Sequence, residues 1–198
     1  MPTRTEIFLF DVASGANCPA EFWDSIQERH LLDLEGAWSE SLRQLRAKSN
    51  YVRQESSHWN WRVKVNSIRG QLGNKSFAIE CNNHTQGVMI VSLLSSCRLP
   101  AVKGKPLVYV DYLETAPWNR PSLGVVRFRG AGTVMVSAAI QLSRKEGFGG
   151  RIGLHSLPQS EEWYAKRGMT NLGPDKRYQN LSYFEMSESQ ASAFSPEE

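Results

Sequence analysis

The chain has 198 residues, 40% of them hydrophobic, and a formal net charge of +3. This length fills one core well and leaves little room for two, and so small a charge does not by itself indicate nucleic acid. Cys18, Cys81 and Cys97 are widely spaced and form no C-x-x-C pair, so we expect three reduced thiols in a cytoplasmic protein. The apolar run Ile7–Phe10 ends at Asp11, and no run approaches membrane-spanning length, so we expect neither a leader nor a membrane segment.

The N-terminal third predicts a strand followed by helices. Thr5–Val12 is a compact apolar run that ends in turn-forming residues, which is typical of a strand. Apolar residues recur at helical spacing from Pro19 to about Ala47, with a break or bend expected at Gly36. Tyr51–Gln71 mixes aromatic and basic residues, and we favour an amphipathic helix there.

The segment from Arg43 to Lys75 also has a second interpretation. It holds eight Lys and Arg residues against the single acid Glu55, and tryptophans lie between them. Basic and aromatic residues in alternation can bind single-stranded nucleic acid through charge and stacking. No known nucleic-acid-binding motif supports this alternative, so we do not expect a nucleic-acid partner.

The rest of the chain predicts a mixed sheet. A polar turn separates Ser76–Cys81 from Val88–Leu94, which predicts a hairpin, and Leu107–Ala116 is a second long strand. A strand that returns to its sheet through a helix forms a parallel pair. The later expected elements are a helix at Thr133–Arg144, a strand at Arg151–Leu157, a short helix at Ser160–Arg167 and a strand at Leu181–Met186. We expect one domain over residues 1–186, followed by a flexible, acidic, Ser-rich tail at 187–198.

A glycine-rich turn, Arg127–Gly132, joins the long strand to the helix that follows it. Such a turn leaves backbone N–H groups unpaired at a helix N-terminus, where the helix dipole adds partial positive charge. The sequence R-F-R-G-A-G matches neither the G-x-G-x-x-G nor the G-x-x-x-x-G-K-[ST] nucleotide loop. The turn is therefore a candidate seat for a different phosphate ligand.

The pattern R-x-x-G-x-G resembles the pyrophosphate loop that binds coenzyme A in the GNAT superfamily of N-acetyltransferases. This resemblance implies an α/β GNAT fold, with a mixed central sheet flanked by helices, and acetyl-CoA as co-substrate. It implies that the loop binds the pyrophosphate through Arg127, Arg129, Gly130, Ala131, Gly132 and Thr133. The strand end Leu113–Pro117 resembles the apolar-x-V-x-P signature of the family, which implies that the backbone of Leu113 and Thr115 pairs with the pantetheine amides.

The segment Trp163–Met169 resembles the F/L-Y-x-x-x-G-F element of the same family. The resemblance implies that Tyr164 protonates the departing thiolate. A phenol, with an ordinary pKa of about 10, still carries its proton at neutral pH and can give it to a thiolate whose ordinary pKa is about 8.5. For the base that deprotonates the amine we favour Glu114, with Asp111 second. Strand alternation points these two carboxylates to opposite faces, so only one can face the acceptor.

The chain departs from the family pattern between the strand and the loop. Pro117 and Gly130 are thirteen residues apart, where six are usual, and the insertion occupies residues 118–124. Arg120 has the usual distance from the proline and Arg127 has the usual distance from the glycine. We choose Arg127 for the pyrophosphate, and the insertion could instead shape the acceptor pocket. Leu157 replaces a frequent asparagine that contacts the coenzyme.

The resemblance implies transfer of an acetyl group from acetyl-CoA to the amine of a small molecule or peptide, by direct attack in a ternary complex. The sequence does not name the acceptor, and it leaves a homodimer open. A non-catalytic acyl-CoA-binding regulatory module is the alternative of another class.

Overall fold

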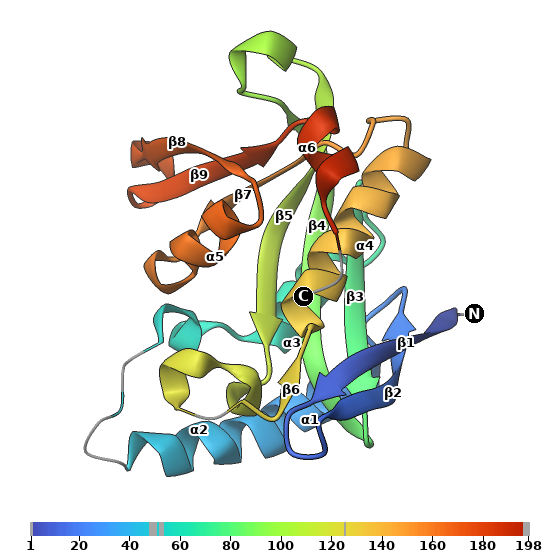
Figure 1. Cartoon of the computed structure of the whole chain (residues 1–198), viewed down its shortest axis with the longest axis vertical. Helices are drawn as coiled ribbons and strands as arrows, with labels where there is room; N and C mark the ends of the chain where they lie inside the picture. The colour runs from blue at the N-terminus through green and yellow to red at the C-terminus, as the bar shows by residue number, and fades with distance from the viewer. Residues whose placement is uncertain (1, 48–50, 52–53, 125, 196–198) are drawn as a thin grey trace. The chain divides into compact units, whose positions relative to one another are not determined.

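The computed structural model describes residues 2–47, 51, 54–124 and 126–195 (Figure 1). Its strands are β1 Arg4–Asp11, β2 Ala16–Trp23, β3 Asn74–Cys81, β4 His84–Ser96, β5 Pro106–Thr115, β6 Phe128–Arg129, β7 Ile152–Ser156, β8 Thr170–Asp175 and β9 Leu181–Met186. Its helices are α1 Glu28–Asp33, α2 Ser39–Arg46, α3 Trp61–Ile68, α4 Ala131–Lys145, α5 Glu161–Lys166 and α6 Glu188–Ala193.

The chain forms two compact units. The first contains Met1–Ile90 and Leu113–Met135, and the second contains Val91–Tyr112 and Val136–Glu198. Strands β4 and β5 and helix α4 contribute residues to both. None of the helices in the described ranges is long and apolar enough to cross a bilayer.

The sheet of the first unit has the strand order β6-β1-β2-β3-β4-β5. Strands β1 and β2 form an antiparallel hairpin, in which Arg4 lies opposite Trp23 and Asp11 opposite Ala16 (Figure 1). The short strand β6 pairs with the other edge of β1 at Phe10 and Asp11. The sequence predicts β1 correctly to within one residue at each end.

Strand β2 corrects the prediction of a helix that begins at Pro19. Pro19 lies opposite Phe8 in the hairpin, and the ladder from β2 to β3 begins only at Glu21. A proline is tolerated there because its missing N–H removes no bond from that ladder. The helical spacing of Phe22, Trp23 and Ile26 therefore arises from a strand and the connection after it.

The long helical segment continues through Gly36 without a break. Helices α1 and α2 are joined by a turn of π-helix at Leu34–Trp38, where the backbone bonds shift from i+4 to i+5. The Ser39 hydroxyl donates to the Leu34 carbonyl across this turn, at 3.1 Å. The break or bend that the sequence predicts at Gly36 is thus a single turn of the wider π-helix.

His30 fixes the start of α1, and its burial beside Glu80, whose Oε2 lies 3.3 Å from Nε2, predicts a stability that depends on pH. Its Nδ1 accepts the Gln27 N–H at 2.9 Å, and the side chain is 1% exposed. Burial, with a smaller contribution from the Arg29 charge, lowers the pKa of His30 from 6.5 to about 4. Protonation would also replace the lone pair that the Gln27 N–H needs.

We therefore expect the free energy of unfolding to fall by about 3 kcal/mol as the pH drops from 6.5 to 4, because the unfolded imidazole binds its proton first. Urea denaturation at a series of pH values measures this loss. His30→Gln should flatten the slope, whereas His58→Gln, at an exposed position, should preserve it. Equal slopes in wild type and His30→Gln would contradict this assignment.

The sheet of the second unit has the strand order β4-β5-β7-β9-β8. Strands β5 and β7 are parallel, with Val108 opposite Ile152, whereas β7–β9 and β8–β9 are antiparallel. The expected mixed sheet is thus confirmed. The sequence analysis missed β8, whose register with β9 is irregular between Asn171 and Pro174.

The sequence predicts a flexible tail at 187–198, but part of this segment is helical. Helix α6 begins in a capping box, in which the Gln190 N–H donates to the Ser187 hydroxyl and the Ser187 N–H donates to the Gln190 side chain. Ala191 is 1% exposed. A cap and a buried contact stabilise this short helix despite its polar composition.

Candidate active site

The glycine-rich turn lies at the N-terminus of the 15-residue helix α4. Gly130 has φ +98°, a conformation that L side chains rarely adopt. Its carbonyl accepts the Val134 N–H at 2.9 Å. Among the described residues, no hydrogen bond engages the N–H groups of Ala131, Gly132 and Thr133. These three donors at the positive end of a helix dipole suit an anion.

The two arginines of the turn have exposed side chains. Arg127 and Arg129 flank Phe128, which is 1% exposed, and the Arg127 guanidinium lies 5.1 Å from the Phe128 ring centroid. Both cations therefore remain available to a ligand. Ala131 and Thr133 are each 3% exposed, whereas Gly132 between them is half-buried.

The 118–124 insertion anchors this turn. The Arg127 N–H donates to the Trp118 carbonyl at 2.7 Å, and the Phe128 N–H donates to Asn119 Oδ1 at 2.9 Å. The buried Gln86 Oε1 in turn accepts from both Trp118 Nε1 and Asn119 Nδ2, each at 2.9 Å. The insertion thus supports the loop that follows it in sequence. Sequence analysis missed Gln86, because a polar residue in an apolar strand gives no signal of its partners.

Glu114 is the centre of a hydrogen-bonded cluster at the end of β5. Its carboxylate accepts from the Ser56 hydroxyl at 2.7 Å, Trp61 Nε1 at 2.5 Å and Arg120 Nη2 at 2.9 Å. The side chains of Glu114 and Arg120 are each 10% exposed. Arg120 Nε and Nη2 also donate to the Thr115 carbonyl, at 2.8 and 2.6 Å.

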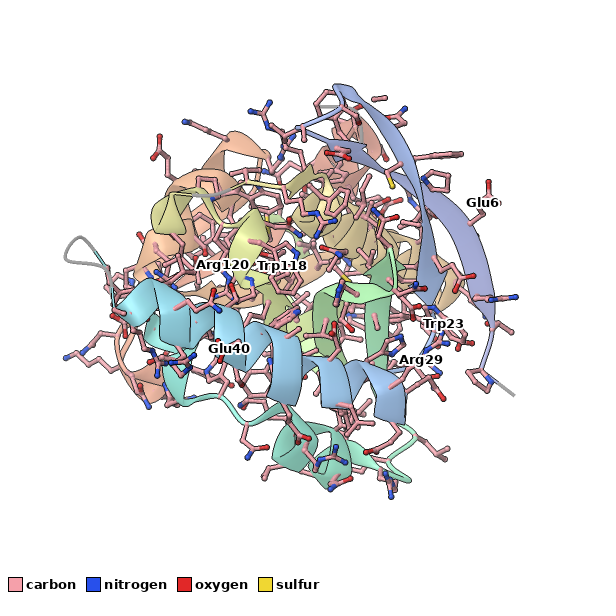
Figure 2. The ribbon with its side chains drawn as sticks, turned by 90° about the horizontal axis from the view of Figure 1, so that it is seen from below. Glu6, Trp23, Arg29, Glu40, Trp118 and Arg120 are labelled. Carbon is pink, nitrogen blue, oxygen red and sulfur yellow. The ribbon has the colours of Figure 1, made fainter. Side chains whose placement is uncertain are left out.

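Arg120 therefore stabilises the end of β5, and its guanidinium is already hydrogen-bonded to Glu114 and Thr115. It lies 6.0 Å from the Trp38 ring centroid, and the Trp38 and Trp118 rings meet edge to face at 6.5 Å. Figure 2 shows Trp118 and Arg120 near each other beside α2. Arg127 consequently remains the arginine that is free to meet a phosphate.

Arg120→Met is expected to lower the free energy of unfolding by about 3 kcal/mol, because it leaves the Glu114 carboxylate buried without its counter-ion. Urea denaturation measures the loss. Arg43→Met is a suitable control, because Arg43 pairs with Glu40 on the exposed face of α2. Equal unfolding midpoints for the two variants would show that the Arg120–Glu114 pair does not support the fold.

The other candidate residues of β5 have different surroundings. Arg120 Nε and Nη2 both donate to the Thr115 carbonyl, so the lone pairs of that carbonyl are already taken. Leu113 and Asp111 are half-buried. Asp111 belongs to the second unit and Glu114 to the first.

Tyr164 lies on α5, in the second unit. It is 7% exposed, and its ring packs against Trp163 and Phe184 at centroid distances of 5.1 and 5.9 Å. Burial raises the pKa of Tyr164 above its ordinary value. The phenol therefore keeps its proton at neutral pH, as a general acid must.

Two of the six described basic residues of the segment 43–75, Arg43 and Arg62, form ion pairs. Arg43 pairs with Glu40, and Arg62 pairs with Glu28 and Glu35. Trp61 is 6% exposed, and its indole is directed to Glu114. Residues 48–50 and 52–53 lie outside the described residues. The described contacts fit the packed-helix interpretation, and Trp61–Ile68 is the α-helical part of the described residues within Tyr51–Gln71.

No protein-family model matches the chain, and no curated protein matches it in sequence. Solved structures do resemble it. The PaiA N-acetyltransferase of Thermoplasma acidophilum in complex with coenzyme A has a TM-score of 0.55 at 13% identity, and the match covers 85% of this chain and 98% of that one. RimJ of Mycobacterium smegmatis in complex with CoA-disulfide has a TM-score of 0.53 at 14% identity, over 96% of this chain and 92% of that one.

A third structure is a chimera of the spermidine N-acetyltransferase SpeG from Vibrio cholerae, with a TM-score of 0.51 at 13% identity, over 87% of this chain and 98% of that one. The expected fold is thereby confirmed. The chain has the acetyltransferase fold of the GNAT superfamily.

Proposed function

We propose that the chain is an N-acetyltransferase that transfers the acetyl group of acetyl-CoA to an amine. The observation that carries this proposal is the N-terminus of α4, where three N–H groups have no hydrogen-bond partner among the described residues, in a fold that matches coenzyme A-bound acetyltransferases along most of the chain. The same comparison supports an amine acceptor, since one of the similar structures is named for spermidine. A small-molecule or peptide amine is therefore the substrate that we propose.

The residues of the turn fit a diphosphate. The N–H groups of Ala131, Gly132 and Thr133 would hold its oxygens, and the exposed Arg127 and Arg129 would neutralise its charge. The backbone of Leu113 and the N–H of Thr115 would pair with the amides of the pantetheine arm. When bound, acetyl-CoA supplies an acyl group activated as a thioester.

The proton transfers fall to residues of β5 and α5. We assign the amine proton to Glu114, with Asp111 as the second candidate, and the proton given to the leaving sulfur to Tyr164. The three donors that fix the Glu114 carboxylate keep it in one orientation, which is what a positioned base needs.

Glu114→Gln is expected to lower kcat/KM about 100-fold, whereas Asp111→Asn should change it less than about threefold. The variant keeps the size of the side chain, and the thermal midpoint of each protein shows how much of the loss is structural. The decisive comparison is the ratio of kcat/KM between the two variants once their thermal midpoints agree with that of the wild type. The opposite ranking of the two variants would move the role to Asp111.

The proposed activity is tested by release of coenzyme A thiol across a panel of polyamines, aminoglycosides, amino acids and peptides, corrected for hydrolysis without amine. Amine-dependent release of thiol, with acetylated product detected by mass spectrometry, would support an acetyltransferase. Binding of acetyl-CoA without turnover of any amine would instead indicate the non-catalytic acyl-CoA-binding module.

A further inference from the structure

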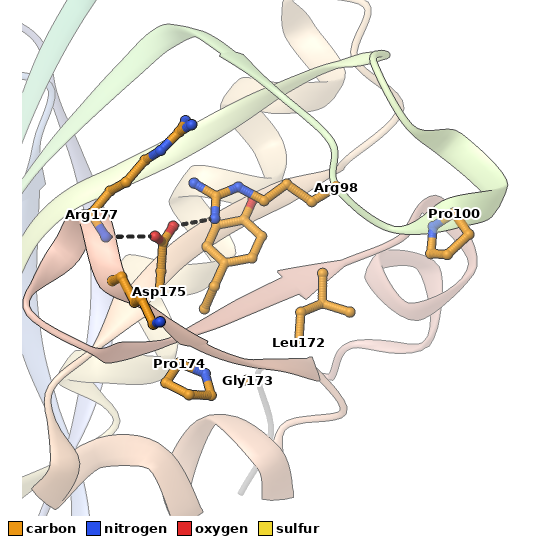
Figure 3. Close-up of a pocket in the computed structure, with 9 residues that line it drawn as sticks. Arg98, Pro100, Leu172, Gly173, Pro174, Asp175 and Arg177 are labelled. Atoms are coloured by element: carbon orange, nitrogen blue, oxygen red, sulfur yellow. Dashed lines mark hydrogen bonds and ion pairs between the residues drawn. The ribbon is translucent and has the colours of Figure 1, made fainter.

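A pocket of about 610 Å³ opens in the second unit, beside the edge strand β8 (Figure 3). Its lining combines cationic and apolar side chains, and none of them belongs to the proposed acetyltransferase site. The residues that matter for its chemistry are Arg98, Lys176, Arg177, Pro100, Leu172 and Pro174.

Arg98 is held in place from three directions. Its Nη1 donates to Asp175 Oδ2 at 2.5 Å, its guanidinium lies 4.1 Å from the Tyr183 ring centroid, and its backbone N–H donates to Glu185 Oε2 at 2.6 Å. Glu185 is 0% exposed and also accepts the Tyr183 hydroxyl and the Leu99 N–H. A guanidinium fixed in this way loses little conformational freedom when it binds a ligand.

Asp175 is itself fixed by a chain of buried polar groups. It accepts from His155 Nε2 at 3.1 Å and from the Arg177 N–H at 2.9 Å. The Tyr109 hydroxyl lies 2.5 Å from His155 Nδ1, in hydrogen-bond distance. The Tyr178 ring stacks on the imidazole, with 3.7 Å between the ring centroids. Figure 3 shows Asp175 between Arg98 and the backbone of Arg177. This network supports the floor of the pocket.

The pocket keeps an excess of positive charge after these pairings. Asp175 offsets Arg98, and the oxygens of Glu185 are turned to the backbone and to Tyr183. Lys176 and Arg177 are exposed, and neither forms an ion pair with any of the residues that the structure describes. Arg98 has five N–H donors, and the described residues accept from one of them.

We propose that this pocket binds a small molecule that carries a phosphate or carboxylate group on a short apolar body. The anion would take the remaining N–H donors of Arg98 together with the Arg177 guanidinium, since planar forks match the oxygens of both groups. Lys176 would add charge, and Leu172, Pro100 and Pro174 would contact the carbon atoms of the body. This site goes beyond the proposed acetyl transfer and shares no residue with it.

The test is a titration of the full-length ¹⁵N-labelled protein with inorganic phosphate, butyl phosphate and butyrate, at constant ionic strength set with chloride. We expect saturable shifts of the Gly173, Lys176 and Arg177 amides, with butyl phosphate or butyrate binding about threefold tighter than an anion without the carbon chain. Comparison of butyl phosphate with butyrate identifies the preferred anion. No saturable shift with any of the three would overturn the proposal.

Two matched variants make the test specific. Arg177→Gln should weaken binding about fivefold, whereas Lys145→Gln, which removes one exposed charge from the end of α4, should change it less than about twofold. Equal affinities of wild type and Arg177→Gln would overturn the proposal.

Saturating acetyl-CoA should leave the phosphate affinity of the pocket unchanged, and competition at the Gly173, Lys176 and Arg177 amides would show that the pocket is not a separate site. These readouts do not depend on turnover.

Discussion

Tyr164→Phe is expected to lower kcat about 100-fold and to leave the Kd for acetyl-CoA unchanged, because the substitution removes only a hydroxyl proton donor. The packed ring is retained, so its contacts with Trp163 and Phe184 should persist. The raised pKa of Tyr164 means that the wild-type phenol is protonated throughout the neutral range. Steady-state kinetics with the best amine of the panel, together with calorimetry of acetyl-CoA, measures both quantities.

Tyr178→Phe is the matched control for this experiment. Tyr178 also belongs to the second unit, but it is 43% exposed and lies outside α5, so its loss of a hydroxyl should not change kcat. Unchanged turnover in Tyr164→Phe would remove Tyr164 from the mechanism. A loss equal in the two variants would indicate a structural effect rather than the loss of a general acid.

Gly130→Asp is expected to weaken acetyl-CoA binding at least about 100-fold, because it places a carboxylate against the proposed diphosphate. A Cβ at Gly130 would lie 3.7 Å from Leu9 Cδ2, an ordinary van der Waals contact, so the larger side chain has room. The conformation at φ +98° costs strain for any L residue. Calorimetry with acetyl-CoA measures the affinity.

Gly130→Asn separates charge from strain. Asn has the shape of Asp and suffers the same backbone penalty, so the difference in Kd between the two variants reports the charge alone. Equal affinities of Asp and Asn variants would mean that no phosphate approaches Gly130. The loop would then be assigned wrongly, even if both variants bound less tightly than the wild type.

The sequence predicts the apolar strands because each is a continuous hydrophobic run. Polar residues at the ends of the strands do not show in this pattern, so the predicted ends are less accurate. Ser76–Cys81 and Leu107–Ala116 agree with β3 and β5 within two residues. The predicted turn of six residues contracts to Asn82 and Asn83, which both adopt positive φ angles. Strand β4 therefore begins at His84, where Thr85 and Gln86 are buried.

Hydrogen-bond partners that are distant in sequence explain why polar residues are buried at the start of β4. The Asp33 carboxylate accepts the Thr85 N–H, and Trp38 Nε1 donates to the Thr85 carbonyl at 2.8 Å. Polar residues are tolerated in a core when such partners satisfy them. The hydrophobic pattern of the sequence carries no information about such partners, so the sequence analysis places Thr85 and Gln86 in the turn.

The same limit applies to the candidate site. Spacing alone left Arg120 and Arg127 as competitors for one phosphate. Only the fold shows that Arg120 is 9% exposed and is bound to Glu114 and the Thr115 carbonyl, while Arg127 is exposed. A resemblance in motif order could predict the fold, because each motif marks the end of a strand or the start of a helix. It could not predict the pairing of side chains across the insertion.

Isothermal titration calorimetry of the full-length protein with acetyl-CoA tests the central claim most directly. The account predicts one site per chain with a Kd of about 10 µM, and a loss of that heat in Gly130→Asp but not in Arg177→Gln. Absence of binding heat at millimolar acetyl-CoA, confirmed at a second temperature, would contradict the claim that the turn before α4 holds the coenzyme.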